Sequence, residues 1–175
     1  MSLREIVVRP YCACWPGIFI QEKAAIEHAL GDVGLAVHHI GSTAVPGLMA
    51  KPIIDILLVV DSLARLDRAS PRLEAQGYEA KGEFGMPGRR YFPKGGLDRT
   101  HQIHAFEQGS GHIERHLAFR DYLIAFPDIA AQYQALKQRV AASCGNDLAR
   151  YCQGKDDFIK THEALALAWR ARAGT

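Results

Sequence analysis

The stretch HIGSTAVPGLMAKPIIDILLVV, residues 39–60, decides the fold of this chain. It ends in the run Ile53–Val60, which is apolar at every position except Asp55. A continuous apolar run of this length is typical of a strand that is buried on both faces of a sheet. The β-rich segment Leu35–Ile40 predicts a second strand before it, with the polar loop Gly41–Pro52 between the two. The stretch therefore predicts a sheet in which one buried strand presents a carboxylate next to a polar loop.

The loop carries groups that are suited to binding phosphate. Gly41 follows a predicted strand directly and permits close approach of the backbone, and successive N–H groups in such a turn can hold an anion. The hydroxyls of Ser42 and Thr43 add hydrogen-bond donors, and Lys51 supplies a positive charge in the same loop. The order of these residues differs from the G-x-x-x-x-G-K-[ST] phosphate loop. We therefore predict a phosphate-binding turn of another kind.

Asp55 is the second candidate in this stretch. Along the strand its side chain shares a face with Ile53, Leu57 and Val59. A carboxylate in such a run is costly unless it is paired, bound to a metal or placed at an open edge of the sheet. We interpret Asp55 as a functional residue. The alternative is a structural aspartate that caps the Lys51–Ile54 turn or pairs with an arginine.

The rest of the chain predicts a mixed first part and a helical second part. Pro16–Leu30 has helical spacing and ends at Gly31. A helix capped by Asp61 or Ser62 is expected to kink or break at Pro71. Further strands are predicted at Tyr78–Glu83, Arg89–Phe92 and Thr100–Glu107. Three helices are predicted after Gly111: the first ends at Pro127, the second ends near Gly145, and the third is expected to be loosened at Gly154. This order indicates an α+β sheet backed by helices, in one domain with an α/β part (1–110) and a helical part (111–175).

The bulk composition is that of a packed globular domain, with 175 residues of which 48% are hydrophobic. A formal net charge of +2 is too small to indicate a nucleic-acid-binding surface, although a few local cations suffice for one phosphate. Met1–Pro10 shows no secretory signal and no run reaches membrane-spanning length, so we expect a cytoplasmic chain with no membrane partner. The four cysteines are expected as free thiols; the alternative is that Cys12 and Cys14 contribute to a metal site.

Several segments together resemble the GrpB family, an uncharacterised group whose fold belongs to the nucleotidyltransferase superfamily. The central HIGSTAVPGL and AKPIID segments carry the resemblance. It continues through GYEAKGEFGMPGRRYFPKG, the strand with His104, HLAFRDYLIAFPDIAAQYQALK, and the region Tyr151–Ile159 with Lys155 and Phe158. The resemblance covers nearly the whole chain from about Val8. It implies a nucleotidyltransferase-like mixed β-sheet backed by helices, with a C-terminal helical region.

The superfamily resemblance also implies a mechanism. In those enzymes a Gly-Ser pair holds the terminal phosphates of a nucleotide, and carboxylates on the next strand bind divalent metal ions that activate a hydroxyl. Gly41 and Ser42 match the first element, and Asp55 matches the first carboxylate. The resemblance thus implies Mg²⁺ or Mn²⁺ as cofactor. It implies a nucleotide or another phosphorylated small molecule as partner.

The sequence departs from this pattern at Leu57, where the second carboxylate would fall. In the family a later strand carries histidine-leucine-histidine, and this chain has Gln-Ile-His at residues 102–104. The resemblance makes His104 the partner of Asp55, as a catalytic and metal-binding candidate, with water or phosphate oxygens completing the coordination. His101 points to the other face of the strand. The alternative for His104 is a hydrogen-bonded histidine of the sheet.

Other cations add candidates. Arg89 and Tyr91 share one strand face and are predicted to grip a phosphate and a base; the alternative is a solvated hairpin. Arg120 is expected to tie a helix to the sheet, although it could instead reach a phosphate. Lys155 matches the family pattern, and an ion pair with a neighbouring aspartate explains it as well as contact with a ligand.

Two functions follow from these residues. The first is a metal-dependent nucleotidyl- or phosphoryl-transferring enzyme that acts on a small molecule. The alternative is a degenerate transferase fold that binds a nucleotide or another phosphate ligand without catalysis, which the missing acid at Leu57 favours. The oligomeric state stays open.

Overall fold

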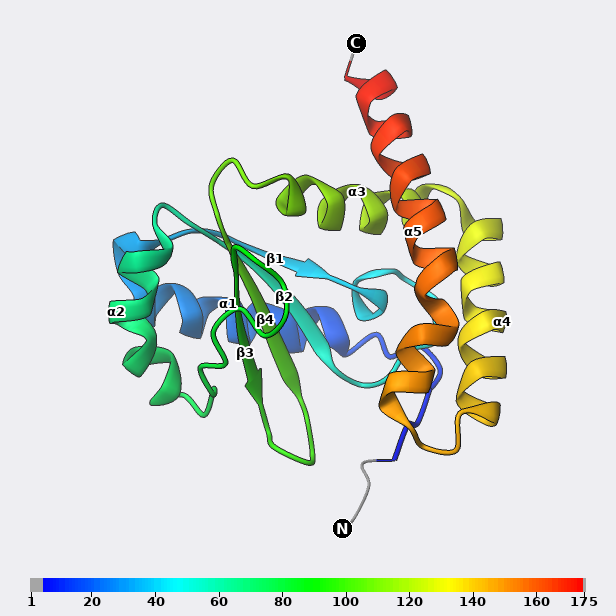
Figure 1. The fold of residues 1–175 in the computed structure, drawn as a ribbon, viewed down its shortest axis with the longest axis horizontal. Coiled ribbons are helices and arrows are strands. Elements are labelled where there is room, and N and C mark those ends of the chain that lie inside the picture. Colours follow the sequence, from blue (N-terminus) through cyan, green and yellow to red (C-terminus); the bar gives the residue numbers. More distant parts are fainter. Residues whose placement is uncertain (1–4, 175) are drawn as a thin grey trace.

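The computed structural model of this chain describes residues 5–174. Within that range a four-stranded sheet has helices on both faces and at one end (Figure 1). The strands are β1 (Gly34–Ile40), β2 (Ile54–Val60), β3 (Arg89–Lys94) and β4 (His101–Glu107). The helices are α1 (Trp15–Leu30), α2 (Leu63–Glu74), α3 (Gly111–Ala125), α4 (Pro127–Ser143) and α5 (Leu148–Ala173). The predicted α+β class, with a helical C-terminal region, is confirmed.

The strand order is β1-β2-β4-β3, which makes β2 a central strand. It runs antiparallel to β1 and parallel to β4, so the sheet is mixed. In this register Asp55 lies opposite Ile40 on one side and Gln102 on the other. The apolar run of β2 follows from this position, because a central strand covered on both faces directs few side chains to water.

The two faces of the sheet are covered by different helices. Helices α1 and α2 cover one face, where alternate residues of β2 join the largest core cluster. On the other face Leu57 of β2 and Phe106 of β4 pack against Leu117 of α3. Helices α4 and α5 lie side by side next to α3 (Figure 1). Asp55 therefore lies where the sheet meets the helical region.

Helix α2 runs unbroken through Pro71, so the predicted kink or break was wrong. The helix begins after Ser62, whose side chain accepts a hydrogen bond from the amide of Arg65. Proline removes the N–H that would bond to the carbonyl four residues earlier. Here that carbonyl, Asp67 O, accepts a hydrogen bond from the Ser70 hydroxyl at 2.9 Å. The hydroxyl replaces the missing donor, and the helix continues to its last turn.

The strand predicted at Tyr78–Glu83 was also wrong. Tyr78 makes an isolated bridge to Lys94, and the chain then turns. Gly82 and Phe84 both have positive φ angles. Such angles leave the extended conformation that a strand needs, so regular pairing with the sheet ends there.

Helix α5 is continuous through Gly154, where we predicted a loosening. A Cβ at this position would lie 2.7 Å from Cγ1 of Val140 on α4. The absence of a side chain therefore serves close packing of α4 against α5, which outweighs the low helix propensity of glycine.

The cysteines differ from the prediction of four free thiols. Cys12 and Cys14 form a disulfide just before α1, while Cys144 and Cys152 are free. The local turn places the two Cα atoms 5.1 Å apart, within the range that a disulfide spans. Because disulfide sulfurs are no longer thiolate ligands, the metal-site alternative for this pair is excluded as well.

No helix in the described part of the chain is both long and apolar enough to cross a membrane. We expected no secretory signal in Met1–Pro10, and residues 1–4 of that segment lie outside the described residues.

Candidate functional site

Asp55 is fixed from two sides at the start of β2. Its Oδ1 lies 3.3 Å from Nε2 of His104 on β4, so the structure brings the two predicted residues together. Its Oδ2 faces Gly41, where an added Cβ would lie only 2.7 Å from that oxygen. Gly41 also has a φ of +74°, which favours glycine. A left-handed turn and the close approach of a carboxylate therefore both require glycine after β1.

A single 3₁₀ turn, η2 (Ser42–Ala44), follows Gly41. The amides of Ala44 and Val45 donate its hydrogen bonds, to the carbonyls of Gly41 and Ser42. The first amides of a short helical turn have no carbonyl partner within that turn. The amides of Ser42 and Thr43 are therefore the donors on which the predicted phosphate-binding turn depends, and anion binding there stays a prediction.

The two hydroxyls of the turn have different partners. Thr43 is buried; its hydroxyl donates to the carbonyl of Ile53 at 3.4 Å and contacts Nε2 of His39 at 2.9 Å. Burial lowers the pKa of His39 to about 4, so its ring is neutral at pH 7. The side chain of Ser42 hydrogen-bonds with Tyr133 of α4. Thr43 therefore stabilises the turn internally, while Ser42 joins the turn to the helical region.

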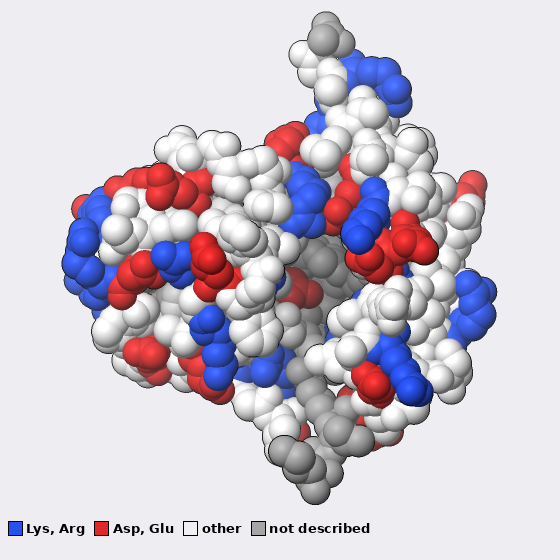
Figure 2. Space-filling view, in the orientation of Figure 1, with Lys and Arg blue, Asp and Glu red and all other residues white. Residues whose placement is uncertain are grey.

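A cavity of about 230 Å³ lies between η2 and the helical region. In the space-filling view the molecule is hollowed between the half that carries the sheet and the half that carries α4 and α5 (Figure 2). Three lysines line the cavity: Lys51 from the loop before β2, Lys137 from α4 and Lys155 from α5. The other lining residues are Gly41, Ser42, Thr43, Ala50, Ile53, Asp55, Gln102, Phe119, Tyr133 and Tyr151. Segments far apart in the sequence thus place cations around one space.

Two tyrosine rings support these lysines. The Nζ atoms of Lys51 and Lys155 lie 4.9 Å and 4.1 Å from the centre of the Tyr151 ring. The Nζ of Lys137 lies 4.7 Å from the centre of the Tyr133 ring. The negative face of an aromatic ring attracts an ammonium group, which helps to keep these cations in partly dry surroundings.

The charges in the cavity are mainly positive. Lys137 is only 2% exposed and donates a hydrogen bond to the carbonyl of Met49. Burial, and then the charges of Lys155 and Lys51, lower the pKa of Lys137 to about 7. Burial and Lys51 likewise lower the pKa of Lys155 to about 8. Among the described lining residues Asp55 is the one acidic side chain, so an anion in the cavity would relieve repulsion between the lysines.

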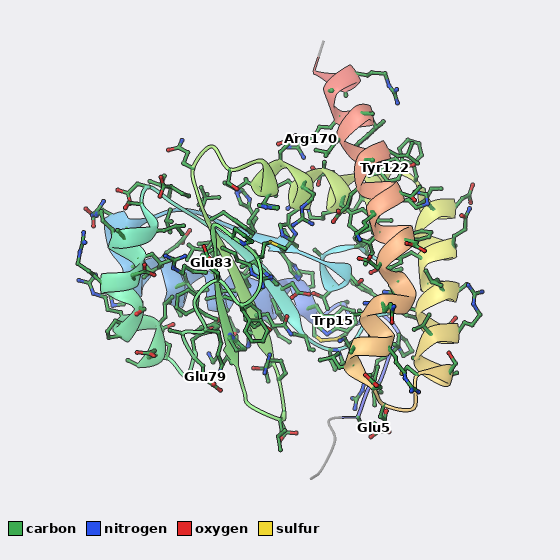
Figure 3. All side chains as sticks on the ribbon, viewed as in Figure 1. Glu5, Trp15, Glu79, Glu83, Tyr122 and Arg170 are labelled. Carbon is green, nitrogen blue, oxygen red and sulfur yellow. A yellow bond between two sulfur atoms is a disulfide. The ribbon has the colours of Figure 1, made fainter. Side chains whose placement is uncertain are left out.

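Arg89 and Tyr91 lie together, but not among the described residues that line the cavity. Arg89 Nη2 donates to the carbonyl of Phe84 at 2.7 Å, and its guanidinium lies over the Tyr91 ring. Tyr91 packs against His104, with ring centres 5.5 Å apart. Arg89 thus secures the loop before β3, in which Glu83 is labelled in Figure 3.

The position at which the superfamily pattern has its second carboxylate holds a core residue in this chain. Leu57 is fully buried and packs with Ile40, Val59 and Phe106 under α3. Among residues 5–174 no group of three or more His, Cys, Asp or Glu side chains comes together. The protein donors for a divalent ion at this place are therefore the pair described above, one carboxylate and one imidazole. Phosphate oxygens of a ligand and water would supply the rest of the coordination.

Arg120 ties α3 to its neighbours, as we expected. Its Nη1 donates to the carbonyl of His39 at 3.1 Å, and its Nε donates to Asp121 at 2.8 Å. Asp121 also accepts a hydrogen bond from Arg170 of α5 at 2.8 Å. In Figure 3 the labelled Arg170 extends from α5 toward α3. This network holds the helical region against β1.

Sequence analysis did not single out Tyr133, Lys137 and Tyr151 as site residues. The signal was present in the helical spacing. Lys137 follows Tyr133 by four residues and Ile129 by eight, so it lies on the buried stripe of α4. A lysine on such a stripe is rare without a specific role. Lys155 follows Tyr151 by four residues in the same way, while the neighbouring Asp156 pairs with Lys160.

A sequence profile of the family described as "GrpB protein" matches residues 5–164. The chain belongs to the GrpB family. The UPF0157 protein YqkA of Bacillus subtilis is 46% identical over 167 residues, which cover 95% of this chain and 49% of YqkA. The crystal structure of the conserved protein GrpB from Enterococcus faecalis has 42% identity and a TM-score of 0.90, and the match covers 94% of this chain and 99% of that one. This GrpB-family chain thus spans about half the length of YqkA.

Two more distant similarities add context for the GrpB-family chain. The structure of the Cid1 poly(U) polymerase with bound Mg 3′-dATP matches with a TM-score of 0.51 and 10% identity, over 74% of this chain and 41% of Cid1. This likeness concerns the fold alone and confirms the nucleotidyltransferase-like architecture. A dephospho-CoA kinase of Mycolicibacterium paratuberculosis is 27% identical over 185 residues, which cover 91% of this chain and 46% of that enzyme.

Proposed function

We propose that this GrpB-family protein binds the phosphate chain of a nucleotide, or of a related phosphorylated small molecule, in the cavity between η2 and the helical region. The observation that carries the proposal is the convergence of Lys51, Lys137 and Lys155 on one space with a single carboxylate among its described lining residues. Like charges held together lower the stability of the empty protein, and a polyanion offsets that loss. The arrangement therefore favours a ligand with several negative charges.

The place of these cations favours a small molecule as partner. They line a cavity, whereas a nucleic acid is usually bound by a basic stripe on the surface. We propose a nucleotide or a CoA-like compound in the cytoplasm, with neither nucleic acid nor membrane as partner. The similarity to a dephospho-CoA kinase places CoA among the first compounds to test.

A second candidate function is nucleotidyl or phosphoryl transfer. The observation that favours it is the pair of Asp55 and His104 beside the cavity, in a nucleotidyltransferase-like fold. Mg²⁺ or Mn²⁺ held by Asp55 and ligand phosphates would neutralise negative charge on those phosphates. The buried Leu57 favours binding over transfer, because it leaves a second metal ion without its carboxylate.

Thermal unfolding of the protein with ATP, GTP, CTP and CoA tests the proposal. At least one compound should raise the melting temperature, because a ligand that binds only the folded state stabilises it. Lys155→Met should remove most of that rise. Lys160→Met is the matched control, since Lys160 is exposed on the same helix and pairs with Asp156. No rise with any of the four compounds would overturn the proposal.

The same measurement with and without Mg²⁺ or Mn²⁺ separates the two candidates. Stabilisation that needs no metal ion and survives Asp55→Asn supports a binding protein. Stabilisation that requires the metal ion and is abolished by Asp55→Asn supports a metal–phosphate site. In the second case, release of pyrophosphate in the presence of small-molecule acceptors tests transfer directly.

A further inference from the structure

Lys137 differs from the other two lysines of the cavity. Lys51 and Lys155 are half-buried, whereas Lys137 is 2% exposed. The groups that act on its charge are Lys155 from α5 and Lys51 from the loop before β2, both positive. The ring of Tyr133 lies next to it on its own helix, and its Nζ donates to the carbonyl of Met49. Lys137 thus forms the buried wall of the cavity, and the two charged groups that act on it both oppose its positive charge.

The acidic residue of the cavity has its own partner. Asp55 contacts His104 at 3.3 Å through Oδ1, and its Oδ2 faces the backbone of Gly41. The negative charge that would favour the ammonium form of Lys137 is therefore expected from a ligand. The two half-buried lysines already suffice for a single phosphate, so a ligand must bring more charge to engage the third.

We propose, on the basis of the proposed function, that Lys137 is the residue by which the cavity selects a chain of two or more phosphates over a single phosphate, and that it takes up a proton when such a ligand binds. The ligand class is then a nucleoside di- or triphosphate or a compound with an equivalent phosphate chain. Specificity in this class depends on the number of phosphates more than on the base.

The physical basis is a change in protonation. In the empty cavity the pKa of Lys137 is lowered to about 7 by burial and by its two positive neighbours, so at pH 8 the side chain is mainly a neutral amine. A nearby phosphate favours the charged form and raises this pKa. The resulting ammonium group donates charge-assisted hydrogen bonds, which are stronger than those of the amine. By linkage, binding of such a ligand weakens as the pH rises above 7.

Isothermal titration calorimetry at pH 8, in two buffers that differ in ionisation enthalpy, measures affinity and proton uptake together. The ligands are ATP, ADP, AMP and inorganic tripolyphosphate. For the wild type we expect ATP to bind with uptake of roughly one proton more than AMP, because any proton that Lys155 takes up is common to both ligands. Tripolyphosphate should resemble ATP. The affinity of ATP relative to AMP should fall about tenfold in Lys137→Met, the effect of losing one charge-assisted hydrogen bond.

Two variants make this test specific. Lys160→Met, which removes an exposed charge from α5, should leave both uptake and preference unchanged. Lys137→Arg keeps a permanent charge at the position, so it should keep the preference for ATP and lose most of the extra proton uptake of ATP over AMP. It also serves as the second variant if Lys137→Met does not fold.

The outcomes separate this inference from the proposed function. If none of the four ligands binds, and GTP, CTP and CoA also leave the melting temperature unchanged, the proposed function fails. If ATP binds to the wild type with no more proton uptake than AMP, or if Lys137→Met retains both the extra uptake and the preference for ATP over AMP, the role of Lys137 is refuted while the proposed function stands.

Discussion

Two clusters of charged side chains lie on opposite faces of the same sheet. In the first, the Glu22 cluster, Glu22 of α1 accepts hydrogen bonds from Lys94 and from the Tyr78 hydroxyl, both at 2.8 Å, and His101 lies 3.8 Å away. In the second, the lysine cluster (Lys51, Lys137 and Lys155), positive charges gather around a cavity. The first cluster satisfies its charge within the fold, and the second repels itself.

The difference teaches when a partly buried charge indicates function. Glu22 and Lys94 neutralise each other, so a structural role explains them without any ligand. Lys137 has Lys155 and Lys51 as the charged groups that act on it, and its hydrogen bond to the carbonyl of Met49 does not neutralise its charge. A cluster of one sign that lines a cavity is therefore better evidence of a binding site than a buried ion pair.

The largest expected change in stability comes from a substitution that breaks the ion pair of the Glu22 cluster. Lys94→Met should lower the free energy of unfolding by roughly 2–4 kcal/mol, because it leaves the carboxylate of Glu22 mostly buried without its cation. Urea denaturation at pH 7 measures the change. Lys81→Met is the control, since Lys81 is exposed and forms its ion pair with the exposed Glu79, so the stability of this variant should match that of the wild type. A fully stable Lys94→Met would show that the cluster is not the ion pair we describe.

The same substitution in the lysine cluster should have the opposite sign. Lys137→Met should raise the free energy of unfolding of the ligand-free protein by about 1 kcal/mol, because it removes a buried amine and its repulsion with Lys155 and Lys51. The measurement is again urea denaturation at pH 7. A loss of stability as large as that of Lys94→Met would mean that Lys137 is a structural residue.

The third difference between the clusters is their dependence on pH. Burial raises the pKa of Glu22, but the hydrogen bonds from Lys94 and Tyr78 and the nearby His101 outweigh it, so the net pKa is lowered. This contribution is present above the ordinary carboxyl pKa and is lost as the pH falls through the lowered value. The pKa of Lys137 is lowered to about 7 from 10.5, so the unfolded chain binds more protons between these values and stability rises with pH there.

Urea denaturation from pH 3 to pH 10 checks both windows. The stability of Glu22→Gln should fall less at acid pH than that of the wild type. The stability of Lys137→Met should rise less above pH 7, and the remainder of that rise comes from Lys155. If Lys137→Met keeps the full alkaline rise, the lysine does not titrate as we describe.

The sequence predicted the sheet side of the candidate site, whereas on the helical side it indicated only Lys155, with an ion pair as the alternative. The apolar run of β2 and its alternation placed Asp55 beside the turn at Gly41, and the register of two neighbouring strands brought His104 to it. The placement of Asp55 and that of His104 both follow from the alternation of side chains along a strand. Lys137 and Tyr151 could not be placed in this way, because the faces that α4 and α5 present depend on how the helices pack.

The errors in the fold have local causes that a pattern does not contain. The Ser70 hydroxyl bonds to the carbonyl that Pro71 leaves without its N–H donor, so the helix continues. A methyl group of Val140 occupies the space that a side chain at Gly154 would need. Gly82 has a positive φ, which ends the extended backbone inside the predicted strand Tyr78–Glu83. Each depends on a contact or a backbone angle, whereas hydrophobic periodicity reports only which side is buried.

The affinity of ATP for matched variants of the two clusters tests the central claim most directly. Titration calorimetry at fixed ionic strength compares the wild type, Lys155→Met and Lys94→Met, at a temperature where all three are folded. We expect Lys155→Met to weaken ATP binding about tenfold or more, and Lys94→Met to leave the affinity unchanged within about twofold. Equal weakening by both substitutions, or no binding of ATP to the wild type, would contradict the central claim.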